Sequence, residues 1–233
     1  LRAGEFLRGN LVVDGRVLRS WRNGQVLDVG FLEDAAAVGL AFLDLFSLTG
    51  AESWLREAQH ITRKMIEDFH DEATGLFFDT PRGHEQLLTR PRDITDNAMP
   101  SGSSLACELL ARMSVFSDDA QADALARQLA DGLAEALARH PLAFGHLSGA
   151  ADLLVHGAIE VAIPGGSEAL EAELARTYVP SLVATRDTGL TPLTNGRATG
   201  TGYVCRRYAC GAPALDPSSF GAQLAAAPRS SNA

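Results

Sequence analysis

Two acidic clusters in the sequence stand where an apolar helix is expected to begin. Glu33 and Asp34 fall in the first turn of one apolar segment, and Asp93 and Asp96 precede a second. Two carboxyl groups that face each other across a cleft can serve as acid and base in glycoside chemistry. We therefore take Asp34 and Asp96 as candidate catalytic residues, and Glu33 and Asp93 as candidate substrate-binding residues.

The second cluster also contains cations and a small hydroxyl residue. Arg90 and Arg92 lie upstream of Asp96, and Ser101 opens the apolar segment behind it. Because arginine offers a planar set of donors that suits carboxylate or ligand oxygens, Arg90, Arg92 and Ser101 join the candidate binding residues. A structural alternative stays open. Acids in a first helical turn complement the helix dipole, Ser101 can be an N-cap, and Asp96 can pair with an arginine.

Other possible chemistry is weaker. Cys205 and Cys210 are five residues apart, but the sequence between them supplies no further zinc ligand. A disulfide or two unrelated thiols is therefore expected. Residues 165–167 (Gly-Gly-Ser) lack the lysine and the spacing of a phosphate-binding loop, and the six histidines are scattered. We predict no metal site and no cofactor.

Composition restricts the classes of partner. The net charge of -9 and the pI of about 5.1 argue against nucleic acid, because affinity for phosphates depends on clustered Lys and Arg. No apolar run approaches the roughly 20 residues that span a bilayer, so no membrane association is expected. Three cysteines are an odd number in a long chain, unlike the disulfide framework of a secreted domain. A reducing compartment follows, and the predicted location is the cytoplasm.

Two pairs of helices are predicted to position the acidic clusters. Residues 31–48 are apolar on nearly all faces, as in a buried helix, whereas residues 52–69 carry apolar side chains at the spacing of one helical face. The same pair returns at 101–116 and 119–139. This repeat predicts a ring of helical hairpins with buried inner helices and outer helices that face water. An irregular helical bundle is the alternative.

The remaining segments are expected to be mixed in structure. The predicted elements are a small β-hairpin at 76–80 and 86–89, a third inner helix in 141–156, a strand at 159–163, a helix at 167–178, strands at 181–184 and 203–205, and a last helix that begins at Pro217. The β structure should be confined to residues 71–100 and to the part after 157. The predicted fold is mainly α, a partial (α/α) barrel in residues 1–157 with a small β-α-β excursion in residues 158–233 of the same domain.

Five motifs in the chain together resemble one protein family. They are Ser20-Trp21-Arg22-Asn23-Gly24, Gly30-Phe31-Leu32-Glu33-Asp34, Gly75-Leu76-Phe77-Phe78-Asp79-Thr80, Asp96-Asn97-Ala98-Met99-Pro100-Ser101-Gly102 and Tyr203-Val204-Cys205 with Cys210-Gly211-Ala212-Pro213. Their order is similar to the C-terminal part of the thioredoxin-domain-containing proteins related to spermatogenesis-associated protein. The resemblance implies a preceding thioredoxin-like domain as a partner. It also implies an (α/α) barrel similar to six-hairpin glycosidases and N-acylglucosamine 2-epimerases.

The resemblance adds Trp21 and Arg22 to the candidate substrate-binding residues. The family tends to have tyrosine where this chain has Ala35 and asparagine where it has Ser103, so two polar groups are missing from the expected mouth. Two hypotheses stay open. One is a barrel that binds or transforms carbohydrate, with glycoside hydrolase or sugar epimerase activity if it is an enzyme. The other is a non-catalytic module that presents substrates or proteins to the thioredoxin-like domain.

Overall fold

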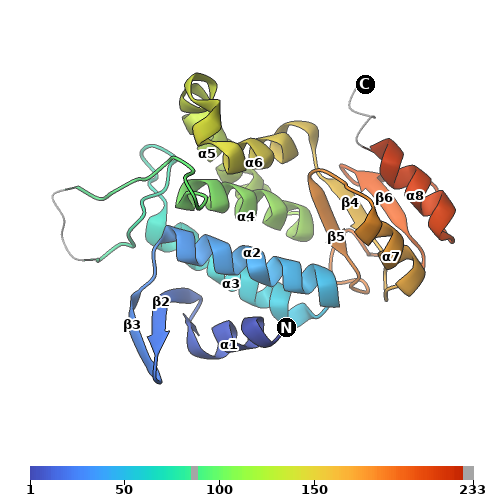
Figure 1. Cartoon of the computed structure of the whole chain (residues 1–233), viewed down its shortest axis with the longest axis horizontal. Coiled ribbons are helices and arrows are strands. Elements are labelled where there is room, and N and C mark those ends of the chain that lie inside the picture. The colour runs from blue at the N-terminus through green and yellow to red at the C-terminus, as the bar shows by residue number, and fades with distance from the viewer. Residues whose placement is uncertain (85–88, 228–233) are drawn as a thin grey trace.

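Two helical hairpins form the centre of the molecule (Figure 1). The computed structural model describes residues 1–84 and 89–227, and this part of the chain is mainly α-helical. Helices α2 (Leu32–Thr49) and α3 (Glu52–Phe69) make the first hairpin, and α4 (Gly102–Ser117) and α5 (Ala120–Arg139) make the second. The inner helices α2 and α4 pack against each other and against their own outer helices. The four predicted helices are therefore confirmed.

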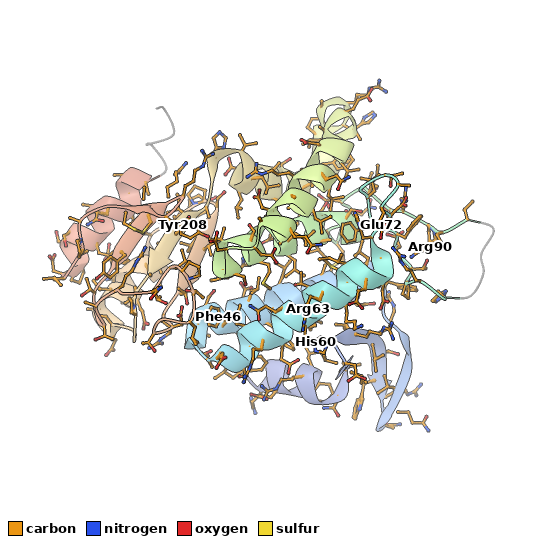
Figure 2. The ribbon with its side chains drawn as sticks, turned by 180° about the vertical axis from the view of Figure 1, so that it is seen from behind. Phe46, His60, Arg63, Glu72, Arg90 and Tyr208 are labelled. Carbon is orange, nitrogen blue, oxygen red and sulfur yellow. A yellow bond between two sulfur atoms is a disulfide. The ribbon has the colours of Figure 1, made fainter. Side chains whose placement is uncertain are left out.

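The inner and outer helices differ in burial as their sequences predict. Phe42, Phe46, Leu109 and Met113 of the inner helices are at most 2% exposed. The outer helix α3 buries one stripe, made of Trp54, Ala58, Ile61, Met65 and Phe69. Its other side faces water, where Arg63 lies exposed (Figure 2). An all-round apolar helix is thus covered by its neighbours, and an amphipathic helix covers it.

A third helix and a second sheet continue the chain. Helix α6 (Gly145–His156) packs against α4 after a 3₁₀ turn at Pro141–Ala143, so the third inner helix is confirmed in part of its predicted range. Strands β4 (Ile159–Ala162) and β5 (Leu182–Thr185) are parallel and are joined through α7 (Glu168–Arg176), as the predicted β-α-β unit requires. Strand β6 (Tyr203–Arg206) pairs antiparallel with β4, and β7 (Ala209–Cys210) completes the order β5-β4-β6-β7.

The second sheet lies between two apolar layers. Ala162 and Val183 join the core of the helical hairpins, and α2 contacts β5. Ile159 and Val161 point to the opposite face, where they pack with Phe220 of α8 (Pro217–Ala226) and with α7. The last helix begins at the predicted proline. No helix in the described ranges is both long and apolar enough to cross a membrane.

The N-terminal β structure corrects the prediction that strands occur only in residues 71–100 and after 157. After α1 (Arg2–Asn10), strands β1 (Val12–Val13), β2 (Arg16–Arg22) and β3 (Gln25–Val29) form an antiparallel sheet. The two-residue turns between them are Asp14-Gly15 and Asn23-Gly24, and all four residues have positive φ. Asp-Gly and Asn-Gly are the strongest short signals for such hairpins. The sequence therefore contained this information.

The hairpin predicted in the connecting segment is also corrected. Residues 76–80 form no strand, and only Phe77 makes an isolated bridge, to His70. Of the second predicted strand only residue 89 lies among the described residues. The backbone of Asp79 explains the difference, because its N–H donates to Pro91 O and its carbonyl accepts from Leu32 N. The segment thus bonds to two separate neighbours instead of one strand.

Candidate functional site: an acidic cleft

A cleft of 450 Å³ opens where α2 and α4 begin. A Cβ atom on Gly102 would lie 3.0 Å from the backbone nitrogen of Glu33 and 3.1 Å from Leu32 Cβ. Glycine therefore lets the two helix N-termini lie side by side. The segment between the hairpins and one residue of β2 complete the walls. The charged and hydroxyl groups of the lining include Arg19, Glu33, Asp79, Asp93 and Ser101.

Asp79 is the half-buried carboxyl group of this cleft. Burial raises its pKa, and the nearby charges of Asp93 and Glu33 raise it further. A hydrogen bond of 2.7 Å from the N–H of Asp93 to Asp79 Oδ2 acts in the opposite direction. The net effect is a pKa above the ordinary value. The protonated form of Asp79 is therefore favoured more than that of an aspartate in water.

Arg19 holds the exposed rim of the cleft in place. Its Nη1 donates to Glu33 Oε1 at 2.7 Å and to Asp34 Oδ2 at 2.9 Å, and its guanidinium carbon lies 4.6 Å from the centre of the Phe31 ring. The hydrogen bond with Glu33 raises the pKa of Arg19, so this side chain stays charged. The Glu33 side chain remains 47% exposed. A carboxylate is thus oriented at the mouth without being removed from water.

Asp34 and Asp96 have capping roles. Asp34 Oδ2 accepts from the N–H of Phe31 at 2.8 Å, which closes the first turn of α2. Asp96 Oδ1 accepts from Ser101 N at 2.9 Å, and its Oδ2 accepts from His146 N at 2.8 Å. Burial raises the pKa of Asp96, but these hydrogen bonds lower it more. In the structure both carboxylates thus accept from backbone N–H groups at a helix start.

Ser101 caps α4 and also lines the cleft. Its Oγ accepts from Ser104 N at 3.1 Å, and the residue is 6% exposed. Together with Glu33 and Asp93, it is one of the candidate residues that the structure brings to the cleft. The predicted pairing of Asp96 with an arginine is replaced by its bonds to backbone N–H groups.

Arg90 and Arg92 both lie over one aromatic ring. Their guanidinium carbons are 4.0 and 3.9 Å from the centre of the Phe78 ring. Arg90 also donates to the carbonyls of Thr80 and Asp68, and Arg92 forms an ion pair with Asp71. Figure 2 shows Arg90 on the segment that connects the hairpins. These contacts fix that segment, while the cleft lining takes its cation from Arg19.

Trp21 and Arg22 belong to the N-terminal sheet. Both lie at the end of β2, beside the Asn-Gly turn. The Trp21 ring packs edge-on against Phe6 at 5.2 Å and is 40% exposed, and Arg22 is exposed. The nearest residue of this strand that lines the cleft is Arg19. Their role as binding residues stays a prediction.

Comparison with known proteins finds a distant relative over most of the chain. No protein-family model matches the chain. The chain is similar to human spermatogenesis-associated protein 20. The two are 25% identical over 241 aligned residues, which cover 91% of this chain and 31% of that protein. The chain therefore spans about a third of the length of this relative, and the similarity extends from the helical hairpins through the second sheet.

A second hollow lies where α6 meets the second sheet. Its volume is 640 Å³, and its lining includes Glu108, Arg112, His146 and Asp152. Glu108 Oε2 lies 2.7 Å from His146 Nε2, and this hydrogen bond raises the pKa of the histidine. Sequence reasoning missed this pair, because its members are far apart in the chain. Asp79 differs, since it belongs to the third of the five motifs and could have been selected from it.

Proposed function

We propose that this chain binds a small polyhydroxylated ligand, a sugar or a sugar derivative, in the acidic cleft. The observation that supports the proposal is the half-buried Asp79, whose pKa is raised next to the acids Glu33 and Asp93. A protonated carboxyl group donates a hydrogen bond and an ionised one only accepts. Sugar hydroxyls do both, so a cleft that combines carboxyl groups with the donor Arg19 suits them.

We further propose that the hairpins are part of an (α/α) barrel. Three inner helices in succession, α2, α4 and α6, pack side by side, and two of them begin at the same cleft. In a ring of hairpins, this arrangement repeats around an axis and the inner N-termini surround one mouth. The cleft would then be part of that mouth, where connecting segments supply the binding residues.

The chemistry that this cleft offers is proton transfer. Asp79 would act as the acid, and Glu33 or Asp93 would act as the base or nucleophile, because their environments differ. This assignment replaces Asp34 and Asp96, whose oxygens bond to backbone N–H groups. Glycoside hydrolysis or sugar epimerisation is therefore the proposed class of reaction.

Calorimetric titration with a panel of neutral mono- and disaccharides tests the proposal. At least one sugar should bind. Asp79→Asn and Glu33→Gln should each weaken the binding of that sugar by about tenfold, which is the effect of one lost hydrogen bond. Glu67→Gln is the matched control, because Glu67 is an exposed acid on α3 that contacts Lys64. The proposal fails if no sugar binds, or if the control weakens binding as much as the cleft variants.

A second candidate function is a module that presents substrates or proteins to a thioredoxin-like domain. One observation favours it: Met99, at the rim of the cleft, is 73% exposed. An exposed apolar side chain beside charged groups suits a protein partner. In this case an added thioredoxin-like domain would cause NMR shift changes in this chain, and Met99→Asp would abolish them. The sugar titrations would then show no heat of binding.

For either function we propose a cytoplasmic location, from the number of cysteines alone.

A further inference from the structure

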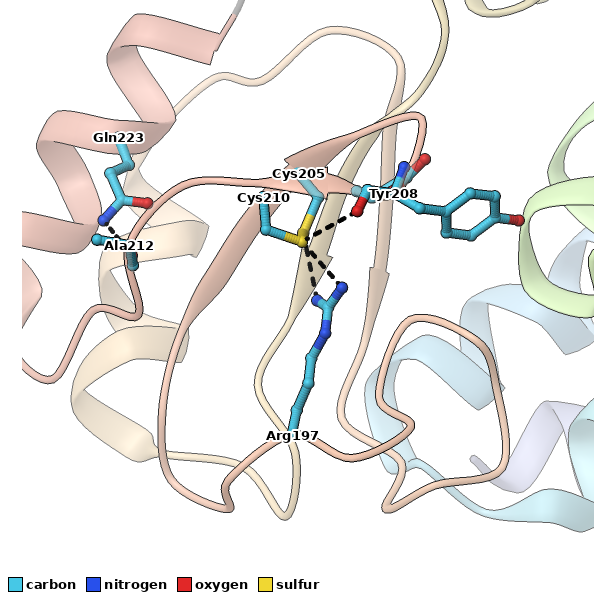
Figure 3. The surroundings of a disulfide bond; sticks show 7 residues. Arg197, Cys205, Tyr208, Cys210, Ala212 and Gln223 are labelled. Carbon is cyan, nitrogen blue, oxygen red and sulfur yellow. Dashed lines mark hydrogen bonds between the residues drawn. A yellow bond between two sulfur atoms is a disulfide. The ribbon is translucent and has the colours of Figure 1, made fainter.

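One guanidinium group contacts both sulfurs of a disulfide at the end of the molecule opposite the cleft. Cys205 and Cys210 face each other across β6 and β7 and are bonded (Figure 3). Arg197 Nη1 lies 3.2 Å from Cys205 Sγ, and Nη2 lies 3.0 Å from Cys210 Sγ. Cys205 is 3% exposed, whereas Cys210 is open to solvent. Cys210 is therefore the exposed residue of the pair, and a cation is already in contact with both sulfurs.

We propose that Cys205–Cys210 is a thiol–disulfide exchange site, which accepts two electrons from a dithiol while Arg197 stabilises the departing thiolate. A cation next to a cysteine favours the thiolate form, and a sulfur that leaves as a stable thiolate leaves faster. This site is separate from the acidic cleft, so it does not rest on sugar binding.

A purely structural role explains the disulfide less well. The two cysteines are only five residues apart, and closing so short a loop constrains the unfolded chain little. The hairpin is also closed without the bond. Arg207 and Tyr208 form its turn with φ of 49° and 62°, and the N–H of Tyr208 donates to buried Glu160 Oε2 at 2.9 Å. Positive φ at both residues is the geometry of a two-residue turn that follows the twist of its strands, so the backbone itself closes this hairpin.

The exchange proceeds in two balanced steps. A thiolate of the dithiol attacks the exposed Cys210 Sγ, a new S–S bond forms to that sulfur, and the Cys205–Cys210 bond breaks. Cys205 leaves as a thiolate beside Arg197 Nη1. The second thiol of the dithiol then attacks the mixed disulfide and releases Cys210. The dithiol becomes a disulfide, its two protons pass to Cys205 and Cys210, and two electrons enter this chain.

Buried Glu160 offers a place for one of these protons. It is 3% exposed and lies directly opposite Cys205 in the register of β4 and β6. Burial raises the pKa of its carboxyl group, so the protonated form is favoured more than at the surface.

The test follows reduction of the folded chain by dithiothreitol, a simple dithiol, with iodoacetamide and mass spectrometry as the readout. Two new alkylated cysteines should appear while the far-UV circular dichroism spectrum is unchanged. The third cysteine, Cys107, is 0% exposed and burial raises its pKa to about 12, so it should not react. Arg197→Gln should slow the reduction by about tenfold, because the leaving thiolate loses its cation.

Arg207→Gln is the matched control. Arg207 lies in the same hairpin, but its guanidinium donates to the carbonyl of Val155, so this variant should react at the wild-type rate. Arg197→Lys keeps the charge and should fall between wild type and Arg197→Gln. If the bond is only structural, reduction waits for the sheet to open, and Arg197→Gln reacts as fast as wild type or faster. That result, or no reduction before unfolding, would overturn the proposal.

Discussion

The two inner helices begin side by side, yet their first turns expose different groups. At the start of α4, Ser101 is 6% exposed and Ser103 and Ser104 are 0% exposed. At the start of α2, the Glu33 side chain is 47% exposed and meets Arg19 at the edge of the cleft. The repeated hairpin therefore reproduces a helix and its burial, whereas the side chains around each helix start decide whether that start is buried or exposed.

This difference has an energetic consequence. The entrance of α4 is a set of hydrogen bonds, in which part-buried Asp96 accepts from Ser101 N and His146 N and buried Ser101 accepts from Ser104 N. A buried donor that loses its partner cannot turn to water, so each loss is costly. The polar groups at the entrance of α2 are more exposed to solvent, and exposed ion pairs contribute little to folding stability. Substitutions should thus reduce stability at α4 and ligand binding at α2.

The largest expected effect concerns the core that both hairpins share. Phe42→Ala should lower the free energy of unfolding by about 3–5 kcal/mol, because Phe42 is 0% exposed and its removal leaves a cavity. Urea unfolding followed by circular dichroism measures this loss. Arg56→Ala on the outer helix α3 should stay within about 0.5 kcal/mol of wild type. A loss below about 1 kcal/mol at Phe42 would contradict the assignment of α2 as an inner helix.

Asp96→Asn should have the next largest effect. The amide keeps one acceptor but loses the charge and the second oxygen, so a backbone N–H of Ser101 or His146 is left weakly paired. The expected loss is about 1–3 kcal/mol by the same unfolding measurement. Asp93→Asn in the cleft is the control and should cost less. Equal losses of unfolding free energy in Asp96→Asn and Asp93→Asn would contradict the proposed difference between the two helix entrances.

The stabilisation by Asp96 should depend on pH. Because the pKa of Asp96 is lowered in the folded chain, its ionised form stabilises the fold. This contribution is complete above the ordinary value of 3.8 and disappears as the pH falls through the lower folded value. The stability difference between wild type and Asp96→Asn should therefore shrink in acid below pH 3.8. A difference that stays constant on acidification would show that the charge has no part in the cap.

Ser101→Ala isolates the N-cap of α4. Its Oγ is the side-chain acceptor for Ser104 N, and loss of such a cap costs about 1 kcal/mol. The thermal midpoint of unfolding should fall by a few degrees, roughly 2–4 °C for a chain of this size. Ser218→Ala, in the first turn of α8, replaces a serine that is not the N-cap of its helix and should leave the midpoint unchanged. An unchanged midpoint in Ser101→Ala would assign the capping to other groups.

Much of the helical framework followed from the sequence, because apolar spacing reports directly on burial. Local patterns of this kind predicted the boundaries of α2 and α4 and the position of strand β4. The N-terminal sheet was missed, although Asp14-Gly15 and Asn23-Gly24 are typical of the two-residue turns that connect its strands. The alternating strands around them carry many polar residues, and β2 buries only Val17. A strand with so little buried surface as β2 leaves a weak pattern.

The candidate site was predicted only in part. Glu33, Asp93 and Ser101 line the cleft, but the roles expected for Asp34 and Asp96 depended on where single oxygens point. Sequence spacing cannot distinguish an acid that bonds to backbone N–H groups from one that faces a cleft. Asp79 could not be ranked either, because its raised pKa arises from burial and from the approach of residues distant in the chain.

The smallest expected effect on stability is that of Asp79→Asn. Because the pKa of Asp79 is raised in the folded chain, its ionised form is unfavourable there at neutral pH, and an amide removes this cost. The variant should be as stable as wild type, within about 0.5 kcal/mol, or slightly more stable. Urea unfolding at pH 7 measures the difference. A loss comparable with that of Asp96→Asn would make Asp79 a structural residue.

The most direct test of the account is an NMR titration of the ¹⁵N-labelled chain with the sugar that binds best in calorimetry. The account predicts shift changes at the amides of Glu33, Asp79, Asp93 and Ser101, which saturate with the calorimetric affinity. The amides of Cys205 and Cys210, at the opposite end of the molecule, should not move. Saturating changes around the second hollow, at His146 and Asp152, with an unperturbed cleft would contradict the central claim.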